Sequence, residues 1–291
     1  LYGLTFEIGI ITTLSGDHIE FHGSREAYLE AKLSLLGMIR PRGHFITSVE
    51  NRELERCLTR LDSSIHAHIL GRDHPYTIQT CDLHSVRGTF EGRPFTVHLG
   101  LEVFATNTLL ALLASSVITA KNPVELLPHL SNVRPLKGRM QAVPNDKGVL
   151  VFIDYAHTIG AYEHLFAFIK QVRGTSRVIT VMGAAGGRDK KKRSVLGGIA
   201  SKESDILILT EEDPVFEELS AINGMIRNGI ASKSCRVLEI DDRKEAIGEA
   251  IRLAQAGDIV LLLGKGHEQS IQRRNRTIPW DEEQAVLEVI R

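Results

Sequence analysis

The stretch RVITVMGAAGGRDKKKR, Arg177 to Arg193, decides the fold of the second half of this 291-residue chain. It starts with an apolar strand pattern, typical of a strand buried on both faces, and runs through glycines into a basic helix start. Similar apolar strands alternate with helical stretches on either side: VLVFID (149–154), DILILT (205–210), RVLEID (236–241) and DIVLLLG (258–264). This alternation predicts a doubly wound, Rossmann-like α/β domain with a parallel sheet.

Ligands of doubly wound domains bind beyond the carboxyl ends of the strands, so the loops there are candidate sites. These loops are DYAHT (154–158), GAAGGRDKKKR (183–193), TEEDP (210–214) and GKGHEQS (264–270). The glycines and cations of the second loop predict an anion site, and a flexible turn before a solvated basic helix start is the alternative. Asp154 suits a sugar hydroxyl or a helix cap. Neither the Walker A pattern nor G-x-G-x-x-G is matched in the glycine loop.

The first half of the chain mixes strands and helices. Its predicted elements are a strand at 6–14, a helix at 25–36, a strand at 44–49, four short strands within 65–99, and helices at 105–120 and 124–133. The four short alternating strands predict an antiparallel meander. The segment at 134–148, rich in proline and glycine, predicts a linker and thus two domains, 1–135 and 136–291.

Composition excludes several functional classes. The net charge of −1 argues against nucleic acid or an anionic membrane surface as a partner. Three widely spaced cysteines argue against a disulfide framework and favour a reducing cytoplasm. No apolar run approaches the roughly 20 residues of a membrane span. The oligomeric state is left open.

The opening stretch LSGDHIEFHGSREAYLEAK (14–32) places histidines before an amphipathic helix and a lysine inside it. Ser24 can cap this helix, and Lys32 falls beside its apolar face. His18 and His22 lack a third ligand at zinc spacing. By themselves these residues predict a capped helix with a solvated lysine.

The four loops of the second half, in this order, resemble the Mur ligases, and in particular their muramyl-tripeptide synthetase branch. The resemblance extends through GRM (138–140) and the opening stretch, so it covers essentially all 291 residues. It implies a central ATP-binding domain followed by a C-terminal amino-acid-binding domain. The implied reaction adds a third residue, a diamino acid, to UDP-N-acetylmuramoyl-L-alanyl-D-glutamate in peptidoglycan biosynthesis, with ATP and Mg²⁺, through an acyl phosphate.

The resemblance also assigns residues. It implies that Lys32 is carbamylated and, with His18, serves Mg²⁺ and catalysis; a carbamate is a hard, anionic ligand, whereas an ammonium repels a metal. The positions implied for the nucleotide are Asn107, Arg139, Asp154 and His157. The positions implied for the incoming amino acid are Arg188, Asp213, Pro214, Gly264 and Glu268, with Arg188 on the α-carboxylate and Glu268 on the distal amine.

The chain departs from the family pattern in three places. The phosphate-binding G-T-N-G-K-T loop and the uridine-nucleotide domain are absent from the 291 residues, so the chain alone is expected to lack a complete ATP site. Where diaminopimelate-adding members read D-N-P-R, this chain reads EDPV (212–215), which favours L-lysine over meso-diaminopimelate. Phe104 replaces a frequent asparagine. The alternatives are a folylpolyglutamate-type ligase, whose motif usually reads D-G-A-H-N rather than DYAHT, and a non-catalytic binding module.

Overall fold

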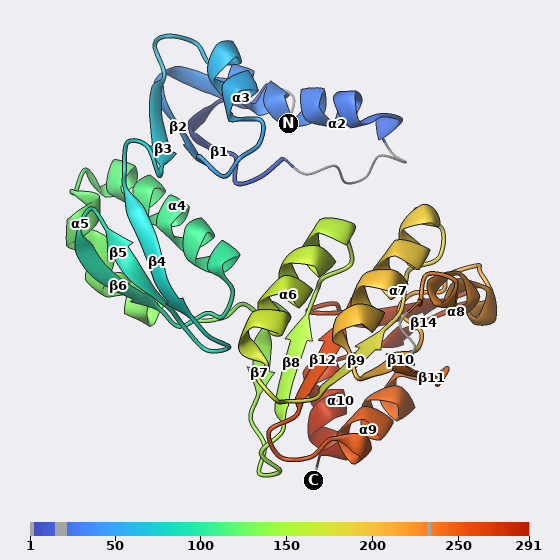
Figure 1. Ribbon diagram of the computed structural model, residues 1–291. Coiled ribbons are helices and arrows are strands. Elements are labelled where there is room, and N and C mark those ends of the chain that lie inside the picture. Colours follow the sequence, from blue (N-terminus) through green and yellow to red (C-terminus); the bar gives the residue numbers. More distant parts are fainter. Residues whose placement is uncertain (1–2, 15–21, 232–233, 291) are drawn as a thin grey trace. The chain divides into compact units, whose positions relative to one another are not determined.

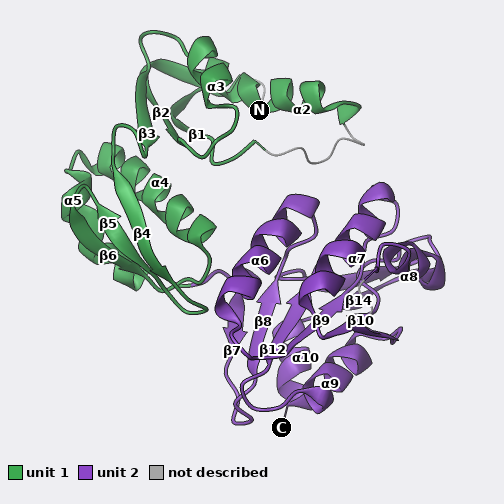
Figure 2. Cartoon of the chain, viewed as in Figure 1, with its two compact units in different colours: residues 1–134 green, residues 135–291 purple. Residues whose placement is uncertain are grey.

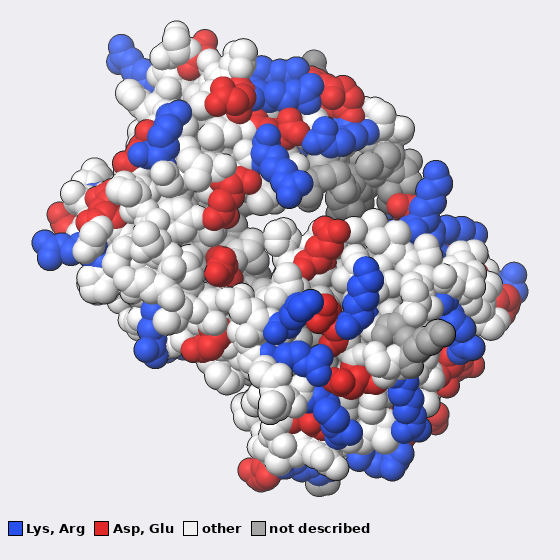
Figure 3. Space-filling view, viewed as in Figure 1, with Lys and Arg blue, Asp and Glu red and all other residues white. Residues whose placement is uncertain are grey.

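The computed structural model describes residues 3–14, 22–231 and 234–290. The chain forms two compact units, residues 1–134 and 135–291, and each is described by itself (Figures 1 and 2). On the face shown in Figure 3, acidic and basic side chains are interspersed, in keeping with the net charge of −1.

The second unit is built on a six-stranded sheet. Its strands are β7 (Gln141–Val143), β8 (Leu150–Asp154), β9 (Val178–Met182), β10 (Ile206–Leu209), β11 (Arg236–Glu239) and β12 (Ile259–Leu263), in the order β11-β10-β9-β12-β8-β7. All neighbours pair in parallel except β7, which is antiparallel to β8. The prediction of a doubly wound α/β domain is confirmed, and β8 to β12 coincide with the five predicted strands to within two residues.

Helices cover both faces of this sheet. They are α6 (Ile159–Val172), α7 (Lys191–Glu203), α8 (Leu219–Arg227), α9 (Arg243–Leu253) and α10 (Glu282–Val289). Helices α6 and α7 lie on one face, with α8 beside α7, whereas α9 and α10 lie on the other (Figure 2). Apolar residues of α9 and α10, among them Ile247 and Val286, bury one face of the strands. Burial on both faces explains the near-continuous apolar strands.

Two features of the second unit differ from the prediction. Strand β7 lies inside the segment expected to be a linker. It was not predicted because three residues are too few to show an alternating pattern. An antiparallel hairpin, β13 (Ser270–Arg273) and β14 (Arg276–Pro279), follows the GKGHE loop. Its polar sequence hid it from a reading based on apolar periodicity.

The first unit contains two three-stranded sheets. One holds β1 (Phe6–Ile10), β2 (Ile39–Ser48) and β3 (His66–Leu70), all parallel, and the other holds β4 (Tyr76–Cys81), β5 (Val86–Phe90) and β6 (Arg93–Val97), all antiparallel. The predicted meander therefore loses its first strand. An unpredicted helix, α3 (Leu54–Arg60), joins β2 to β3 and allows them to pair in parallel.

The other helical elements of the first unit are α2 (Arg25–Leu33), η1 (Ser34–Met38), α4 (Glu102–Thr119), α5 (Pro123–Leu126) and η2 (Leu127–Asn132). Ser24 caps α2, as predicted, by accepting a hydrogen bond from the Ala27 amide at 3.1 Å. In the described part of the chain, α4 alone has the length and apolar composition of a membrane span. Its buried side chains, among them Leu109 and Leu113, pack in a core with residues of β2, β5 and β6.

Candidate active site

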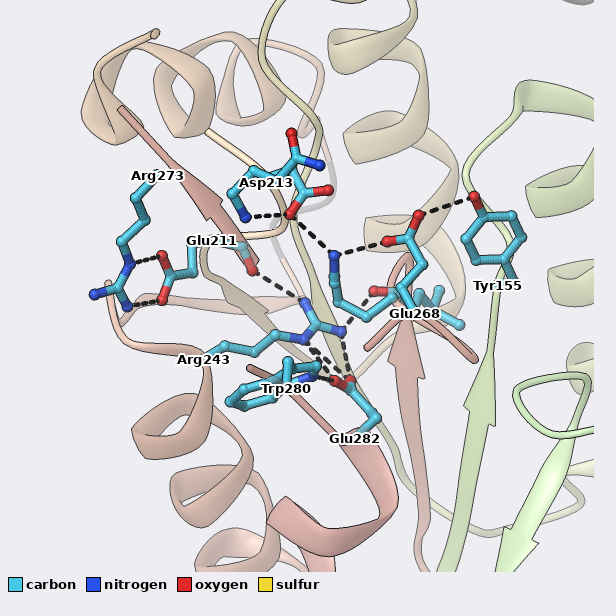
Figure 4. Close-up of polar contacts among 11 residues, drawn as sticks. Tyr155, Glu211, Asp213, Arg243, Glu268, Arg273, Trp280 and Glu282 are labelled. Carbon is cyan, nitrogen blue, oxygen red and sulfur yellow. Dashed lines mark hydrogen bonds and ion pairs between the residues drawn. The ribbon is translucent and has the colours of Figure 1, made fainter. Parts of the chain in front are cut away.

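Two acidic side chains assigned by resemblance to the incoming amino acid meet at the carboxyl-end edge of the sheet. Asp213 follows β10 and Glu268 follows β12, and a fully buried lysine, Lys265, joins them (Figure 4). The Lys265 ammonium donates to Asp213 Oδ1 at 3.0 Å and to Glu268 Oε2 at 2.7 Å. The structure thus brings together side chains that are more than 50 residues apart in sequence.

Sequence reasoning missed Lys265. The signal available was a lysine between two glycines directly after a buried strand, a position where a solvated side chain is the ordinary expectation. The turn buries it instead, because Gly264 and Gly266 have φ values of 101° and 49°. A buried ammonium requires anionic partners, and the two carboxylates supply them.

Gly264 faces another acidic side chain, the buried Glu212. A Cβ on Gly264 would lie 2.5 Å from Glu212 Oε2, so a larger residue would displace this carboxylate, and the φ of 101° also favours glycine. Burial raises the pKa of Glu212, and the nearby positive charges of Arg243, Lys265 and Lys192 oppose that rise.

The glycine loop after β9 packs on the acidic loop after β10. The Gly186 amide donates to the Asp213 carbonyl oxygen at 2.7 Å, and a Cβ on Gly186 would overlap the Pro214 carbonyl oxygen. Gly183 is likewise packed against the backbone at Thr210. These two glycines therefore allow close contact between the loops, and Pro214 takes part through its backbone carbonyl oxygen.

Two cations of the glycine loop pair with a single carboxylate, Glu217, and the anion site expected for the loop as a whole stays a prediction. Arg193 is fully buried and makes a bidentate pair with Glu217, at 2.8 and 3.0 Å, and Lys190 lies 3.2 Å from the same carboxylate. The Arg193 hydrogen bonds, with that of the Gly187 amide, lower the pKa of Glu217 to about 2. Arg188 is exposed and makes no hydrogen bond or ion pair with any described residue, so its guanidinium is available to a ligand.

A buried arginine fixes the two acidic loops relative to each other. Arg243 of α9 donates to the backbone oxygens of Glu211 at 3.1 Å and Leu263 at 2.8 Å, and it pairs with Glu282 (Figure 4). The Trp280 indole donates to the same carboxylate at 2.6 Å. Glu211 lies in the loop after β10 and Leu263 ends β12, so this network holds together the two loops that carry Asp213 and Lys265.

The residues implied for the nucleotide in the second unit lie around Asp154. Its two oxygens accept hydrogen bonds from the Met140 and Ala156 amides, each at 2.8 Å, and burial raises its pKa. Each oxygen keeps a further acceptor position, which fits a sugar hydroxyl. The cap of α6 is Thr158, whose hydroxyl accepts from the Ala161 amide.

Tyr155 connects this region to the acidic pair. Its hydroxyl donates to Glu268 at 3.1 Å, the Arg139 guanidinium lies 4.9 Å from its ring centroid, and its backbone oxygen lies 2.8 Å from His157 Nδ1. Burial, together with the charge of Glu268, raises the pKa of Tyr155 to about 12. Arg139, Asp154 and His157 are thus neighbours in the fold.

The metal-site prediction concerns the first unit. His18 lies outside the described residues. Lys32 is exposed on α2, with its ammonium 5.6 Å from the Tyr28 ring centroid, and Asn107 is exposed on α4. Among the described residues no group of three or more His, Cys, Asp and Glu side chains could hold a metal ion. The site formed by Lys32 and His18 therefore stays a prediction.

A hollow of about 430 Å³ lies beside the acidic loop. Val215, Phe216, Asp242 and Arg273 are among the residues that line it, and Asp213, Lys265 and Glu268 are not. The candidate site is therefore defined by the ion-paired side chains and not by this hollow.

Comparisons with known proteins agree with the two-part organisation. The family described as "Mur ligase middle domain" matches residues 1–114, and the family described as "Mur ligase, glutamate ligase domain" matches residues 138–266. A UDP-N-acetylmuramoyl-L-alanyl-D-glutamate--2,6-diaminopimelate ligase of Bacteroides thetaiotaomicron is 33% identical over 99% of this chain and 60% of its own length. A UDP-N-acetylmuramyl-tripeptide synthetase of Borreliella burgdorferi is 33% identical over 97% of this chain and 57% of its own length.

A solved structure of a 2,6-diaminopimelate ligase bearing the same name as the first relative superposes with a TM-score of 0.61 at 26% identity. It covers 97% of this chain and 60% of that one. The chain therefore spans about 60% of the relatives that it matches. Its two halves carry the middle and glutamate ligase domains in the family's order, and the chain accordingly belongs to the Mur ligase family.

Proposed function

We propose that the chain is part of an ATP-dependent ligase of peptidoglycan biosynthesis, acting in the cytoplasm, that joins a diamino acid to UDP-N-acetylmuramoyl-L-alanyl-D-glutamate. The observation that carries the proposal is the meeting of Asp213 and Glu268 on Lys265, beside a loop that presents an unpaired arginine, Arg188. An amino acid with a distal ammonium needs one fixed cation and a fixed anionic group. The site contains both.

Each end of the acceptor then has a partner. Arg188 binds the α-carboxylate, and the acidic pair Asp213 and Glu268 binds the distal ammonium. The hydrogen bond from the Gly186 amide to the Asp213 carbonyl oxygen supports this arrangement, because it ties the loop of Arg188 to that of Asp213. The names of the two relatives, a diaminopimelate ligase and a tripeptide synthetase, also support a diamino acid as acceptor.

Among diamino acids we expect L-lysine to be favoured over meso-diaminopimelate, although one relative is named for the latter. Val215 offers nothing to a second carboxylate. Two nearby cations are already engaged, since Arg193 pairs with Glu217 and Arg273 pairs with Glu211 at 2.7 Å. An unpaired carboxylate in such a site costs several kcal/mol.

ATP, with Mg²⁺, supplies the phosphoryl group that activates the substrate carboxylate. In this proposal Arg139, Asp154 and His157 are the nucleotide-binding residues of the second unit, and Asn107 is a nucleotide-binding residue of the first unit. Lys32, as its carbamate, and His18 hold the metal. In the second unit, the Arg139 guanidinium and the two Asp154 carboxylate oxygens orient the nucleotide in this proposal.

The test is phosphate release by the full-length protein that carries this chain, supplied with ATP, the UDP-linked dipeptide and one amino acid at a time. We expect a higher kcat/KM for L-lysine than for meso-diaminopimelate. Val215→Arg should shift the ratio toward diaminopimelate, whereas the matched control Val215→Leu should not. A higher kcat/KM for diaminopimelate in the wild type would refute the lysine preference, and no release with any diamino acid would refute the function.

A further inference from the structure

Lys265 is fully buried, so its ammonium cannot take part in a contact at the protein surface. Its two ion-pair partners come from two different loops, Asp213 after β10 and Glu268 after β12. A lysine that only stabilised the fold would be a costly choice, because replacing a buried ion pair by apolar residues is often neutral or stabilising. Its position between two substrate-directed carboxylates points instead to the site.

The carboxylate oxygens of Asp213 and Glu268 accept different numbers of hydrogen bonds. Asp213 Oδ1 accepts from both Lys265 and the Gln272 amide, at 3.0 and 2.8 Å, whereas Oδ2 accepts no bond from the described residues. Glu268 Oε2 accepts from Lys265, and Oε1 accepts from the Tyr155 hydroxyl. The bonds to Lys265, Gln272 and Tyr155 fix how both carboxylates are turned and leave Asp213 Oδ2 open.

The charges give the same indication. Two carboxylates and one ammonium leave a single net negative charge, which one further ammonium neutralises. Without Lys265, Asp213 and Glu268 would repel each other across a poorly solvated site, and the separation that the structure shows would be lost.

We propose that Lys265 is a positioning residue of the acceptor site: it holds Asp213 and Glu268 at a fixed separation, so that together they bind the distal ammonium of the incoming diamino acid. This inference rests on the proposed function, since it concerns the acceptor of that reaction. It assigns Lys265 no contact with the reacting atoms.

The experiment compares wild type, Lys265→Met and Lys265→Arg in the full-length protein, using the diamino acid that the wild type accepts. The control is Lys170→Met, which removes a lysine paired to Glu203 at the surface of the same unit, 3.2 Å apart. For each variant we would measure kcat, the KM for the diamino acid, the KM for ATP, and competitive inhibition by L-norleucine, which has an α-carboxylate but no distal ammonium.

Lys265→Met should raise the KM for the diamino acid about tenfold or more, as expected for disturbed charge-assisted hydrogen bonds. The KM for ATP and inhibition by norleucine should stay within about threefold, and Lys265→Arg should recover much of the loss. An unchanged KM for the diamino acid, or equal weakening of norleucine, would overturn the inference.

Folding is checked by circular dichroism. If Lys265→Met does not fold, Lys265→Gln, which keeps a polar side chain but no charge, answers the same question. It should show the selective rise in KM for the diamino acid, and a normal KM would overturn the inference. A wild type that uses no diamino acid refutes the proposed function itself, so the two failures are distinguishable.

Discussion

Lys32 lies exposed on α2 and makes no ion pair with the described residues, so its ammonium is accessible to carbon dioxide. If it is carbamylated, Lys32→Ala and Lys32→Arg, whose cation does not form the carbamate, should both lower kcat by about 100-fold or more, as expected when a catalytic group is lost. The measurement is phosphate release by the full-length protein, with and without bicarbonate. Bicarbonate should stimulate the wild type, short carboxylates should partly rescue Lys32→Ala, and the exposed-lysine control Lys121→Ala should behave as wild type. Full activity of Lys32→Ala without additives would contradict the prediction.

Val215 shows that backbone strain accompanies the candidate site. It is β-branched yet has φ of 53°, in the left-handed region that favours glycine, and its amide donates to the Gln272 carbonyl oxygen at 3.0 Å. Val215→Gly should therefore stabilise the protein by about 1 kcal/mol after the entropy cost of glycine is subtracted. Urea unfolding measures this. Val195→Gly, on the exposed side of α7, is the control and should destabilise by about 0.5 kcal/mol; a loss of stability in both variants would show that Val215 is unstrained.

At the scale of elements, the Arg193–Glu217 pair joins the start of α7 to the loop before α8. Glu217→Gln leaves a buried guanidinium without its counter-ion, so it should destabilise by about 3 kcal/mol. The Lys170–Glu203 pair, whose lysine is exposed, supplies a control, since Glu203→Gln should lower the free energy of unfolding by about 0.5 kcal/mol or less. Urea unfolding at pH 7 compares the two variants, and equal effects would refute a structural role for the pair.

The same pair predicts a pH dependence. The pKa of Glu217 in the folded protein is about 2, below the ordinary value of 4.5. Its contribution to the stability of the fold is therefore complete above pH 4.5 and is lost as the pH falls toward 2. Glu217→Gln should therefore flatten the decline of stability across that window.

A row of imidazoles along β2 and β3 predicts a second pH dependence. His44 Nδ1 and His68 Nε2 are 2.9 Å apart, and the His66 and His74 rings lie 5.3 and 5.9 Å from those of His44 and His68, measured between centroids. Burial lowers the pKa of His44 and of His68, and the charges of neighbouring histidines lower both further. The charge of Arg40 also lowers the pKa of His44, whereas the charge of Asp73 opposes the lowering at His68.

The folded protein resists protonation of these two rings. Their contribution to the stability of the fold is therefore present above the ordinary histidine pKa of 6.5 and is lost as the pH falls through the lowered pKa values. Thermal unfolding between pH 8 and pH 5 should show this decline, and His68→Gln should reduce it. Proton NMR of the imidazoles provides the direct check: titration of His44 and His68 at or above 6.5 would contradict the prediction.

At the scale of the whole molecule, the second unit contains a core of its own. Strands β7 to β10 and β12 share a buried cluster with α9 and α10 that draws on no residue of the first unit. Residues 135–291 expressed alone should therefore unfold cooperatively, with a free energy of about 5–15 kcal/mol. Urea unfolding followed by circular dichroism and by Trp280 fluorescence tests this, and non-coincident transitions would show that the unit depends on the rest of the chain.

The sequence by itself determined the doubly wound unit, the order of its site loops and the cap of α2. These features are local: a strand buried on both faces is apolar along its whole length, and a cap needs only the residues that follow it. The motif order was also sufficient to indicate the Mur ligases, to which the two family matches assign the chain.

Only the tertiary structure decided which strands pair and which charges are buried. Strand β3 resembles the meander strands in its alternation, yet it pairs in parallel with β2, because pairing depends on the path of the chain between strands. In the sequence, Lys265 had no assigned role, and Arg193 belonged to a predicted anion site or a solvated basic helix start. Each is buried against a carboxylate from a distant loop, at separations of 52 and 24 residues, and periodicity carries no information about such contacts.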